Sequence, residues 1–294
     1  MNAPFGRVLT AMVTPFTADG ALDLARAAEL AVRLVDEGNE GLVVSGTTGE
    51  SPTTSDVEKD TLLRAVIDAV GDRAHVIAGV GTYDTAHTIE SARAAQQAGA
   101  AGLLVVTPYY NRPPQSGLLA HFTAVADATD LPVMLYDIPV RTGVPIETET
   151  LLRLAEHPRI VANKDAKGDL FAAQRVIAET DLAFYSGDDA LNLPLLAVGA
   201  VGFVSVTGHV IASRHAALIE AYTAGEVVKA REINEGCLPI TVGIMTRTQG
   251  AIMSKAALGL VGFPVGPVRL PLVEATPEQL VVLRADLTAG GLLS

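Results

Sequence analysis

The chain has 294 residues, of which 49% are hydrophobic and only 4% aromatic, and its formal net charge is −12. This composition supplies a large aliphatic core, and its acidity argues against nucleic-acid binding and against attachment to an anionic membrane surface. The single cysteine, Cys237, excludes an internal disulfide and fits a reducing cytoplasm. Residues 1–7 do not resemble a signal peptide, and no uninterrupted apolar segment reaches the roughly 20 residues that span a bilayer.

Eight short apolar runs predict β-strands, and each is followed by an amphipathic segment typical of a helix. The runs are continuous rather than alternating, as in parallel strands that helices cover. The predicted strands occupy residues 8–13, 42–45, 75–78, 103–106, 133–136, 160–164, 183–186 and 202–206. The helices that follow them occupy residues 23–38, 55–70, 84–99, 116–128 and 147–156, then segments ending near 178 and 198, and finally 214–224.

Eight β-then-α units predict an α/β fold, a (β/α)8 TIM barrel, over residues 1–224. An open doubly wound sheet is the alternative, but the Gly-rich fingerprint that often follows its first strand is missing. After residue 225 only helices are predicted, at 227–234, 241–258 and 277–289. We interpret residues 225–294 as a C-terminal helical extension packed on the barrel.

Lys164 stands at the end of the sixth predicted strand, where an apolar run meets a turn that contains Gly168. It is one of only five lysines in the chain. Burial removes water from an ammonium group and lowers its pKa, so that the neutral amine can form a Schiff base with a carbonyl substrate. The alternative is a surface lysine paired with Asp165, and this stretch alone does not decide between the two.

Other polar residues follow the carboxyl ends of neighbouring strands, which all lie at one mouth of a (β/α)8 barrel. Tyr136 is the best-placed group for proton transfer, and Thr48 and Tyr110 can extend a relay of hydroxyl groups. The amides of residues 46–49 can bind one carboxylate, and Arg141 can bind a second. Each of these residues alone has an ordinary structural explanation, so their shared position carries the functional interpretation.

The sequence predicts neither a metal site nor a dinucleotide site. Asp188 and Asp189 are expected to cap the next helix. The histidines lack the spacing of a zinc site, and residues 79–81 lack the third glycine of a dinucleotide fingerprint.

Six motifs give the sequence a resemblance to a known family. They are GTTGES at 46–51, VTPYYN at 106–111, LYDIP at 135–139, RTG at 141–143, KDAKG at 164–168 and SGDD at 186–189. From about residue 8 to residue 292 the chain resembles the pyruvate-dependent Schiff-base aldolases, and among them the dihydrodipicolinate synthase family. The resemblance implies that pyruvate forms a Schiff base with Lys164 and attacks L-aspartate 4-semialdehyde, on the route to diaminopimelate and lysine, with no cofactor.

The resemblance also implies a role for individual residues of this chain. The catalytic set would be Lys164, Tyr136, Thr47, Thr48 and Tyr110, with Tyr110 reaching in from a neighbouring subunit. The Thr47–Thr48 amides would hold the pyruvate carboxylate and Arg141 would receive the semialdehyde. The pyruvate pocket would be lined by Val204 and Gly187. Family members are typically homotetramers built from two tight dimers.

The sequence departs from this family at a few positions. Asn163 stands where relatives usually have an aliphatic residue. Strand alternation directs it away from Lys164, toward the helix layer, where it needs a buried partner. The effector pocket of lysine-inhibited relatives carries His, Asn and Glu, whereas the matching residues here, beside a retained Ser51 and Tyr109, are Asp56, Lys59, Tyr83 and His87. We therefore expect weak or no inhibition by lysine.

Two other functions remain open from the sequence. One is another lyase of the same family, acting on a keto-deoxy sugar acid, and the other is a barrel that only senses a small acid. Arg141 and the Thr47–Thr48 pair favour the synthase reaction, and the complete hydroxyl relay argues against a sensor.

Overall fold

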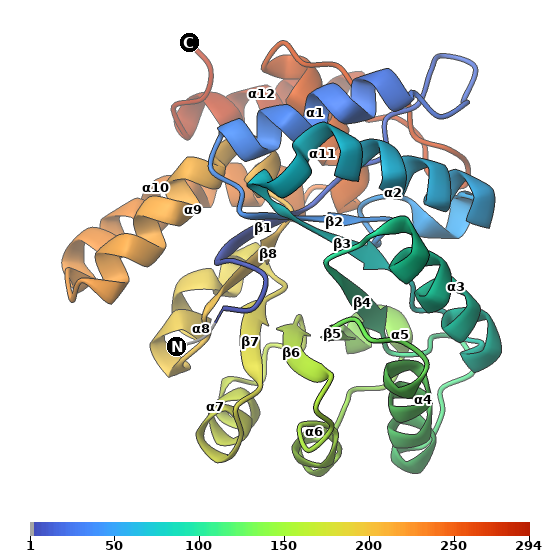
Figure 1. Ribbon diagram of the computed structural model, residues 1–294. Coiled ribbons are helices and arrows are strands. Elements are labelled where there is room, and N and C mark those ends of the chain that lie inside the picture. The colour runs from blue at the N-terminus through green and yellow to red at the C-terminus, as the bar shows by residue number, and fades with distance from the viewer. Residues whose placement is uncertain (1–2) are drawn as a thin grey trace.

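A closed parallel barrel forms the centre of the protein, as seen in a computed structural model that describes residues 3–294 (Figure 1). The strands are β1 Val8–Ala11, β2 Gly41–Val44, β3 His75–Gly79, β4 Gly102–Val106, β5 Val133–Asp137, β6 Ile160–Asp165, β7 Ala183–Ser186 and β8 Gly202–Ser205. They pair in sequence order, and β8 returns to β1. The predicted (β/α)8 barrel is therefore confirmed, and the alternative of an open sheet is wrong.

The seam between β1 and β8 closes the barrel. Leu9 pairs with Val204 in this parallel register. Just beyond the strands, the buried imidazole of His209 accepts a hydrogen bond from the backbone N–H of Val13 at 3.0 Å and donates one to the carbonyl of Val206 at 2.7 Å. The two strand ends are thus joined by a side chain as well as by the sheet.

Helices surround the barrel and follow the strands in turn (Figure 1). The first turns of α1 and α2 are capped by the side chains that open the predicted helices: Asp23 accepts a hydrogen bond from the amide of Arg26, and Ser55 forms a capping box with Glu58. The helices are α1 Leu24–Asp36, α2 Asp56–Val70, α3 Thr85–Ala98, α4 Gln115–Asp127, α6 Thr148–Leu154, α7 Leu170–Glu179, α8 Asn192–Val198 and α9 Gly208–Thr223. Short helical turns lie at η1 Ser51–Thr53, η2 Gly71–Arg73, α5 Pro139–Thr142 and η3 Asp189–Leu191.

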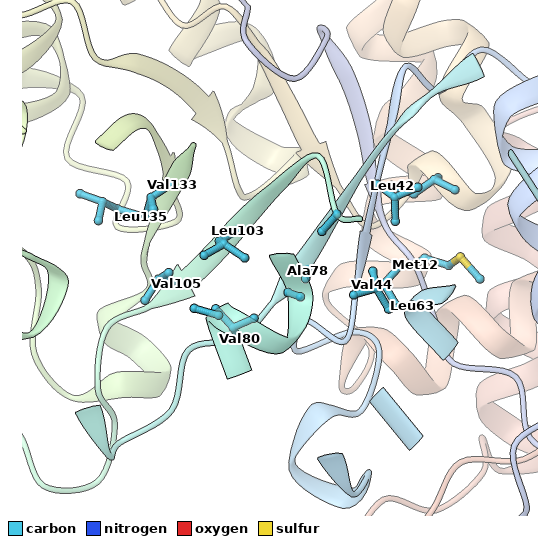
Figure 2. Close-up of a cluster of buried hydrophobic side chains, with 14 of the residues drawn as sticks. Met12, Leu42, Val44, Leu63, Ala78, Val80, Leu103, Val105, Val133 and Leu135 are labelled. Atoms are coloured by element: carbon cyan, nitrogen blue, oxygen red, sulfur yellow. The ribbon is translucent and has the colours of Figure 1, made fainter. Parts of the chain in front are cut away.

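The core has two layers, one outside and one inside the barrel. Outward-facing side chains of neighbouring strands, such as Val44, Leu103 and Leu135, pack in a continuous apolar layer beneath the helices (Figure 2). Inward-facing side chains, such as Ile77, Met134 and Ala162, form a second cluster that fills the barrel. Successive residues along a strand point alternately into these two layers, so the side-chain direction of each residue at a strand end is fixed by the strand.

Three predicted helix boundaries are wrong, one of them because the helix predicted over 241–258 is interrupted at 246–249. Helix α9 begins at Gly208 rather than 214, with non-helical torsions at Ile211. Its first turn is held by the long-range hydrogen bond from the amide of Val13 to His209, which a sequence pattern does not reveal. The predicted break between 234 and 241 is absent. Helix α10 Val227–Met245 runs through Pro239, since the packing of Cys237 and Ile240 overrides the low helix propensity of proline.

The C-terminal helices pack on the barrel. The segment comprises α10, α11 Gly250–Leu260 and α12 Pro277–Ala289. Ile240 of α10 and Leu283 of α12 share one apolar cluster with Val206 and Ile211, which follow β8. Within residues 3–294 no helix is both long and apolar enough to cross a membrane.

Candidate active site

Lys164 is buried inside the barrel near the end of β6. Its side chain is 3% exposed, and its Nζ lies 4.2 Å from the centroid of the Tyr136 ring on the neighbouring strand β5. Desolvation lowers the pKa of Lys164 to about 8. The negative charge of Asp189 raises this pKa in part, and the positive charge of Arg141 lowers it further. About a tenth of the amine is therefore neutral at pH 7, compared with less than about 0.1% for an ordinary lysine.

The alternative pairing of Lys164 with Asp165 is wrong. The carboxylate of Asp165 accepts hydrogen bonds from the backbone N–H groups of Lys167 and Gly168, both at 3.1 Å. Lys167 in turn pairs with the buried carboxylate of Asp137 at 3.2 Å. Across the described residues 3–294, no ion pair within 4 Å involves Lys164, so nothing holds this amine in its protonated form by direct contact.

Tyr136 pairs in register with Lys164 and carries a buried phenol hydroxyl group. It is 5% exposed, and burial raises its pKa to about 12, although Arg141 and a side-chain hydrogen bond with Thr47 pull it down. The phenol is therefore protonated at neutral pH and can donate a proton or pass one on. Thr47, Tyr136 and Arg141 together line a cavity of about 230 Å³, which Leu104 also lines.

The turn that follows β2 supplies the polar wall of this cavity. Thr47 lines the cavity, and Thr48 is buried in the same turn. The turn is closed by a hydrogen bond from the amide of Glu50 to the carbonyl of Thr47, and Thr14 Oγ1 donates to the carbonyl of Gly49 at 2.6 Å. The backbone of this turn is therefore fixed before any ligand arrives.

Val204 and Gly187 complete the neighbourhood of the lysine. Val204 on β8 is fully buried in the same apolar cluster as Tyr136. Gly187 follows β7, and its Cα faces the Lys164 side chain so closely that a Cβ there would lie 2.8 Å from Cγ and 3.0 Å from Cε. Only glycine leaves room for the lysine in this position.

We expect Gly187→Ala to displace the lysine side chain and to slow Schiff-base formation by about 10- to 100-fold, as small misplacements of reacting groups do. The measurement is the rate at which a borohydride-reduced pyruvyl adduct accumulates. Gly236→Ala on α10 is the matched control, because no heavy atom lies within 4 Å of a Cβ at that position. A Gly187→Ala protein that forms adduct as fast as the unmodified protein would contradict the steric argument.

Tyr110 does not join the site of its own chain. It is 93% exposed, and its backbone has a φ of 71°, in the left-handed region that a tyrosine rarely occupies. The adjacent Tyr109 lies among the cavity-lining residues and packs edge-to-face on Tyr83 at 5.4 Å. The structure thus brings together Lys164, Tyr136, Thr47 and Arg141, and leaves Tyr110 pointing outward.

Asp189 is a member of the site that the sequence interpretation missed. Asp188 caps the following turn as expected, accepting a hydrogen bond from Ala190 N. Asp189 is instead fully buried and accepts hydrogen bonds from Ser205 Oγ and from the amides of Val206 and Thr207. Burial alone would raise its pKa, but His215 and these donors outweigh burial and hold it below the ordinary value. Its ionised carboxylate is the opposing charge that keeps Lys164 from a lower pKa.

Asn163 faces the helix layer, as strand alternation predicts. Its neighbours in register, Leu135 and Phe184, belong to the apolar layer outside the barrel. The expected buried partner is not found: neither polar side-chain atom of Asn163 has a hydrogen-bond partner among residues 3–294. A leucine or valine at this position would leave no buried polar group unpaired.

The residue types at the site are those of an amine-based reaction. Among the residues that the structure describes, no three His, Cys, Asp or Glu side chains form a group that could hold a metal ion. A buried lysine, a protonated phenol and an arginine are present instead. They can form an imine with a ketone, transfer protons and bind carboxylates.

Known proteins resemble this chain in sequence and in fold. The model of the dihydrodipicolinate synthetase family matches residues 4–290. The chain is 67% identical to 4-hydroxy-tetrahydrodipicolinate synthase 2 of Streptomyces coelicolor over 290 residues, which covers 99% of this chain and 97% of the relative. A synthase of Kineococcus radiotolerans is also 67% identical, with 98% of this chain and 94% of the relative covered. The crystal structure of DHDPS from Cyanidioschyzon merolae with lysine bound superposes with a TM-score of 0.97 at 43% identity, covering 99% of this chain and 100% of that one. On these grounds, the chain belongs to the dihydrodipicolinate synthetase family.

Proposed function

We propose that this lyase condenses pyruvate with L-aspartate 4-semialdehyde, the 4-hydroxy-tetrahydrodipicolinate synthase reaction named for its relatives. The observation that carries the proposal is the buried amine of Lys164, with a pKa of about 8, 4.2 Å from the ring of Tyr136. The neutral amine adds to the ketone carbon of pyruvate, and loss of water gives the imine. Removal of a methyl proton then gives the enamine, whose carbon attacks the aldehyde. The amino group of the semialdehyde then attacks the imine carbon, which closes the ring and releases the amine of Lys164.

Each step needs a proton carrier, and the hydroxyl groups near the lysine supply it. Tyr136 transfers protons to and from the reacting nitrogen and carbon. Thr47 supports it through a hydrogen bond, and Thr48 extends the relay of hydroxyl groups. The backbone amides of Thr47 and Thr48 hold the pyruvate carboxylate, with Gly187 and Val204 shaping the pocket around the methyl group. Arg141 binds the carboxylate of the semialdehyde at the cavity mouth. The covalent imine makes a separate cofactor unnecessary.

Tyr110 enters the relay of a neighbouring subunit in this proposal. Its 93% exposure and left-handed backbone support this, because a strained, solvent-facing tyrosine gains contacts when a second chain covers it. We propose a cytoplasmic homotetramer built from two tight dimers. A monomeric dihydrodipicolinate synthase variant has a TM-score of 0.95 to this chain, so the fold alone does not determine the oligomeric state. Sedimentation velocity measures it directly.

A coupled assay with both substrates tests the proposed reaction. We expect turnover with pyruvate and L-aspartate 4-semialdehyde to exceed by far the cleavage of sialic acid or of keto-deoxy sugar acids. Preferential cleavage of a sugar acid would instead favour the alternative lyase. Pyruvate binding without any turnover would favour a sensor.

The rate of adduct formation is expected to rise with pH and to level off above about pH 8. The neutral amine is the reacting form, and the lowered pKa of Lys164 makes it about half of the population at pH 8 but only about 1% at pH 6. The measurement is trapping by cyanoborohydride in single-turnover experiments across this range. A rate that keeps rising to pH 10 would mean that the amine is hydrated and unshifted.

Inhibition by lysine is expected to be weak or absent. The residues at the matching positions are engaged with one another: Asp56 pairs with His87 at 2.9 Å and with Lys59 at 3.7 Å. Lys59 also places a positive charge where a cationic effector would approach. Half-inhibition at micromolar lysine in the coupled assay would contradict this expectation. If lysine inhibits the Lys59→Ala protein but not the unmodified protein, the charge of Lys59 is the cause of the weak inhibition.

A further inference from the structure

A buried ion pair joins the turn after β2 to the C-terminal helices. Oε1 of Glu50, the residue after the turn 46–49, lies 2.7 Å from Nζ of Lys255 on α11, and the two side chains are 0% and 5% exposed. Nζ of Lys255 also donates to the carbonyl of Pro267 at 2.6 Å and lies 4.4 Å from the centroid of the Phe16 ring. The reaction proposed above uses neither residue of this pair.

Arg269 extends the connection around the turn. Its backbone N–H donates to the second carboxylate oxygen of Glu50 at 2.8 Å. Its guanidinium donates to the carbonyls of Gly20 and Thr53, both at 2.9 Å, and pairs with both carboxylate oxygens of Glu58 in α2, at 2.6 and 3.1 Å. The segment after α11 therefore holds together the β1–α1 loop, the turn after β2 and the first turn of α2.

This arrangement is costly as a device for stability alone. A buried ion pair returns little net free energy, because two charges lose their water, and an apolar pair of similar volume would stabilise the fold as well. Glu50 also has a φ of 56°, which disfavours any residue but glycine, asparagine or aspartate. Strained backbone conformations of this kind are found mainly at active sites and at ligand-binding segments, where they hold reacting groups in place.

The backbone of Glu50 fixes the turn that carries the two threonines. Its amide donates to the carbonyl of Thr47 at 3.2 Å, and Thr47 lines the cavity beside Tyr136. We propose that Glu50 and Lys255 are positioning residues, which hold the Thr47–Thr48 amides in the orientation that binds the carboxylate of the keto-acid substrate. This inference rests on the proposed function, and it gives the C-terminal helices a role in the reaction.

The test measures both Michaelis constants in variants of the intact protein. Lys255→Met leaves the Glu50 carboxylate buried without its partner, and the Glu50→Gln, Lys255→Met double variant removes both charges while keeping an acceptor for Arg269. In both we expect the KM for pyruvate to rise roughly tenfold and the KM for the aldehyde to change less than twofold, because Arg141 lies on another loop. Lys255→Arg is expected to recover part of the pyruvate affinity.

The control is Arg247→Met, which breaks the ion pair to Asp286 between the end of α10 and α12. It lies in the same helical segment but does not touch the turn, and it is expected to lower Tm and leave both KM values unchanged. If Glu50 and Lys255 have a purely structural role, their variants should behave like Arg247→Met, with a lower Tm and unaltered KM values. That result in the double variant would overturn the inference. Failure of the unmodified protein to form a pyruvyl adduct would instead overturn the proposed function.

Discussion

Lys164→Met is expected to abolish the pyruvyl adduct and to lower kcat/KM by at least about 1,000-fold, the scale of losing a covalent nucleophile. Methionine matches the length and shape of the lysine stem but has no amine. The pocket beside Tyr136 and Gly187 therefore keeps its packing while the chemistry is removed. Intact-mass spectrometry after borohydride reduction and the coupled assay are the two measurements.

The same substitution is expected to stabilise the fold. The pKa of Lys164 is about 8 in the folded chain, below its ordinary value of 10.5, so near neutral pH the folded protein carries almost the full penalty of a buried ammonium group. This penalty is relieved only as the pH rises from about 8 to about 10.5. Methionine removes it, with a gain of up to about 3 kcal/mol at pH 7 and a smaller gain above pH 10.

The matched control is Lys229→Met, which removes an exposed ammonium group paired with Glu226 on the same surface of α10. It should change neither the adduct nor Tm appreciably. A Lys164→Met protein that still acquires the adduct would place the nucleophile elsewhere and sink the proposed reaction. A lower Tm at pH 7 would mean that the ammonium group is solvated in the folded chain.

Tyr136→Phe is expected to lower kcat by about 100- to 10,000-fold, the usual contribution of a positioned proton carrier. Phenylalanine keeps the ring beneath Nζ of Lys164, so the amine should stay in place and the adduct should still form, although slowly. Single-turnover trapping separates these effects, because it reports imine formation independently of the later carbon–carbon bond.

Tyr185→Phe provides the matched control for this prediction. Tyr185 lies on the other side of Lys164 in register and is fully buried, but its hydroxyl donates to the carbonyl of Gly6 at 2.9 Å, away from the amine. Its loss should lower stability by about 1 kcal/mol and leave kcat within a few-fold of the unmodified value. Equal activity losses in the two variants would show that general packing, not proton transfer, is being measured.

The barrel could be predicted because its signal is local. Strands β4 and β5 are uninterrupted apolar runs between turns, and capping residues such as Ser55 mark helix starts within a few positions. The errors arose where distant contacts override local preference. Helix α10 continues through Pro239 because its apolar face is buried.

The site could be predicted as far as strand ends define it. Lys164, Tyr136 and Arg141 follow strands whose carboxyl ends share one mouth, so their proximity follows from topology. The supporting charges could not be found in this way. Asp189 reads as an ordinary helix cap, and Lys255 lies about two hundred residues from its partner Glu50 in a helix with no distinctive motif.

The seam between β1 and β8 has a consequence for the nascent chain. Until residues 202–205 are made and pair with β1, the sheet has two open edges and the wall contributed by Val204 is missing. A lysine that is open to water has an ordinary pKa near 10.5 and is almost entirely protonated at neutral pH. Such an amine reacts with ketones and aldehydes only through its small neutral fraction. Closure of the barrel thus also lowers the pKa of Lys164 and makes its amine reactive. In an unfinished chain, the water around the lysine keeps it protonated and slows adventitious imine formation.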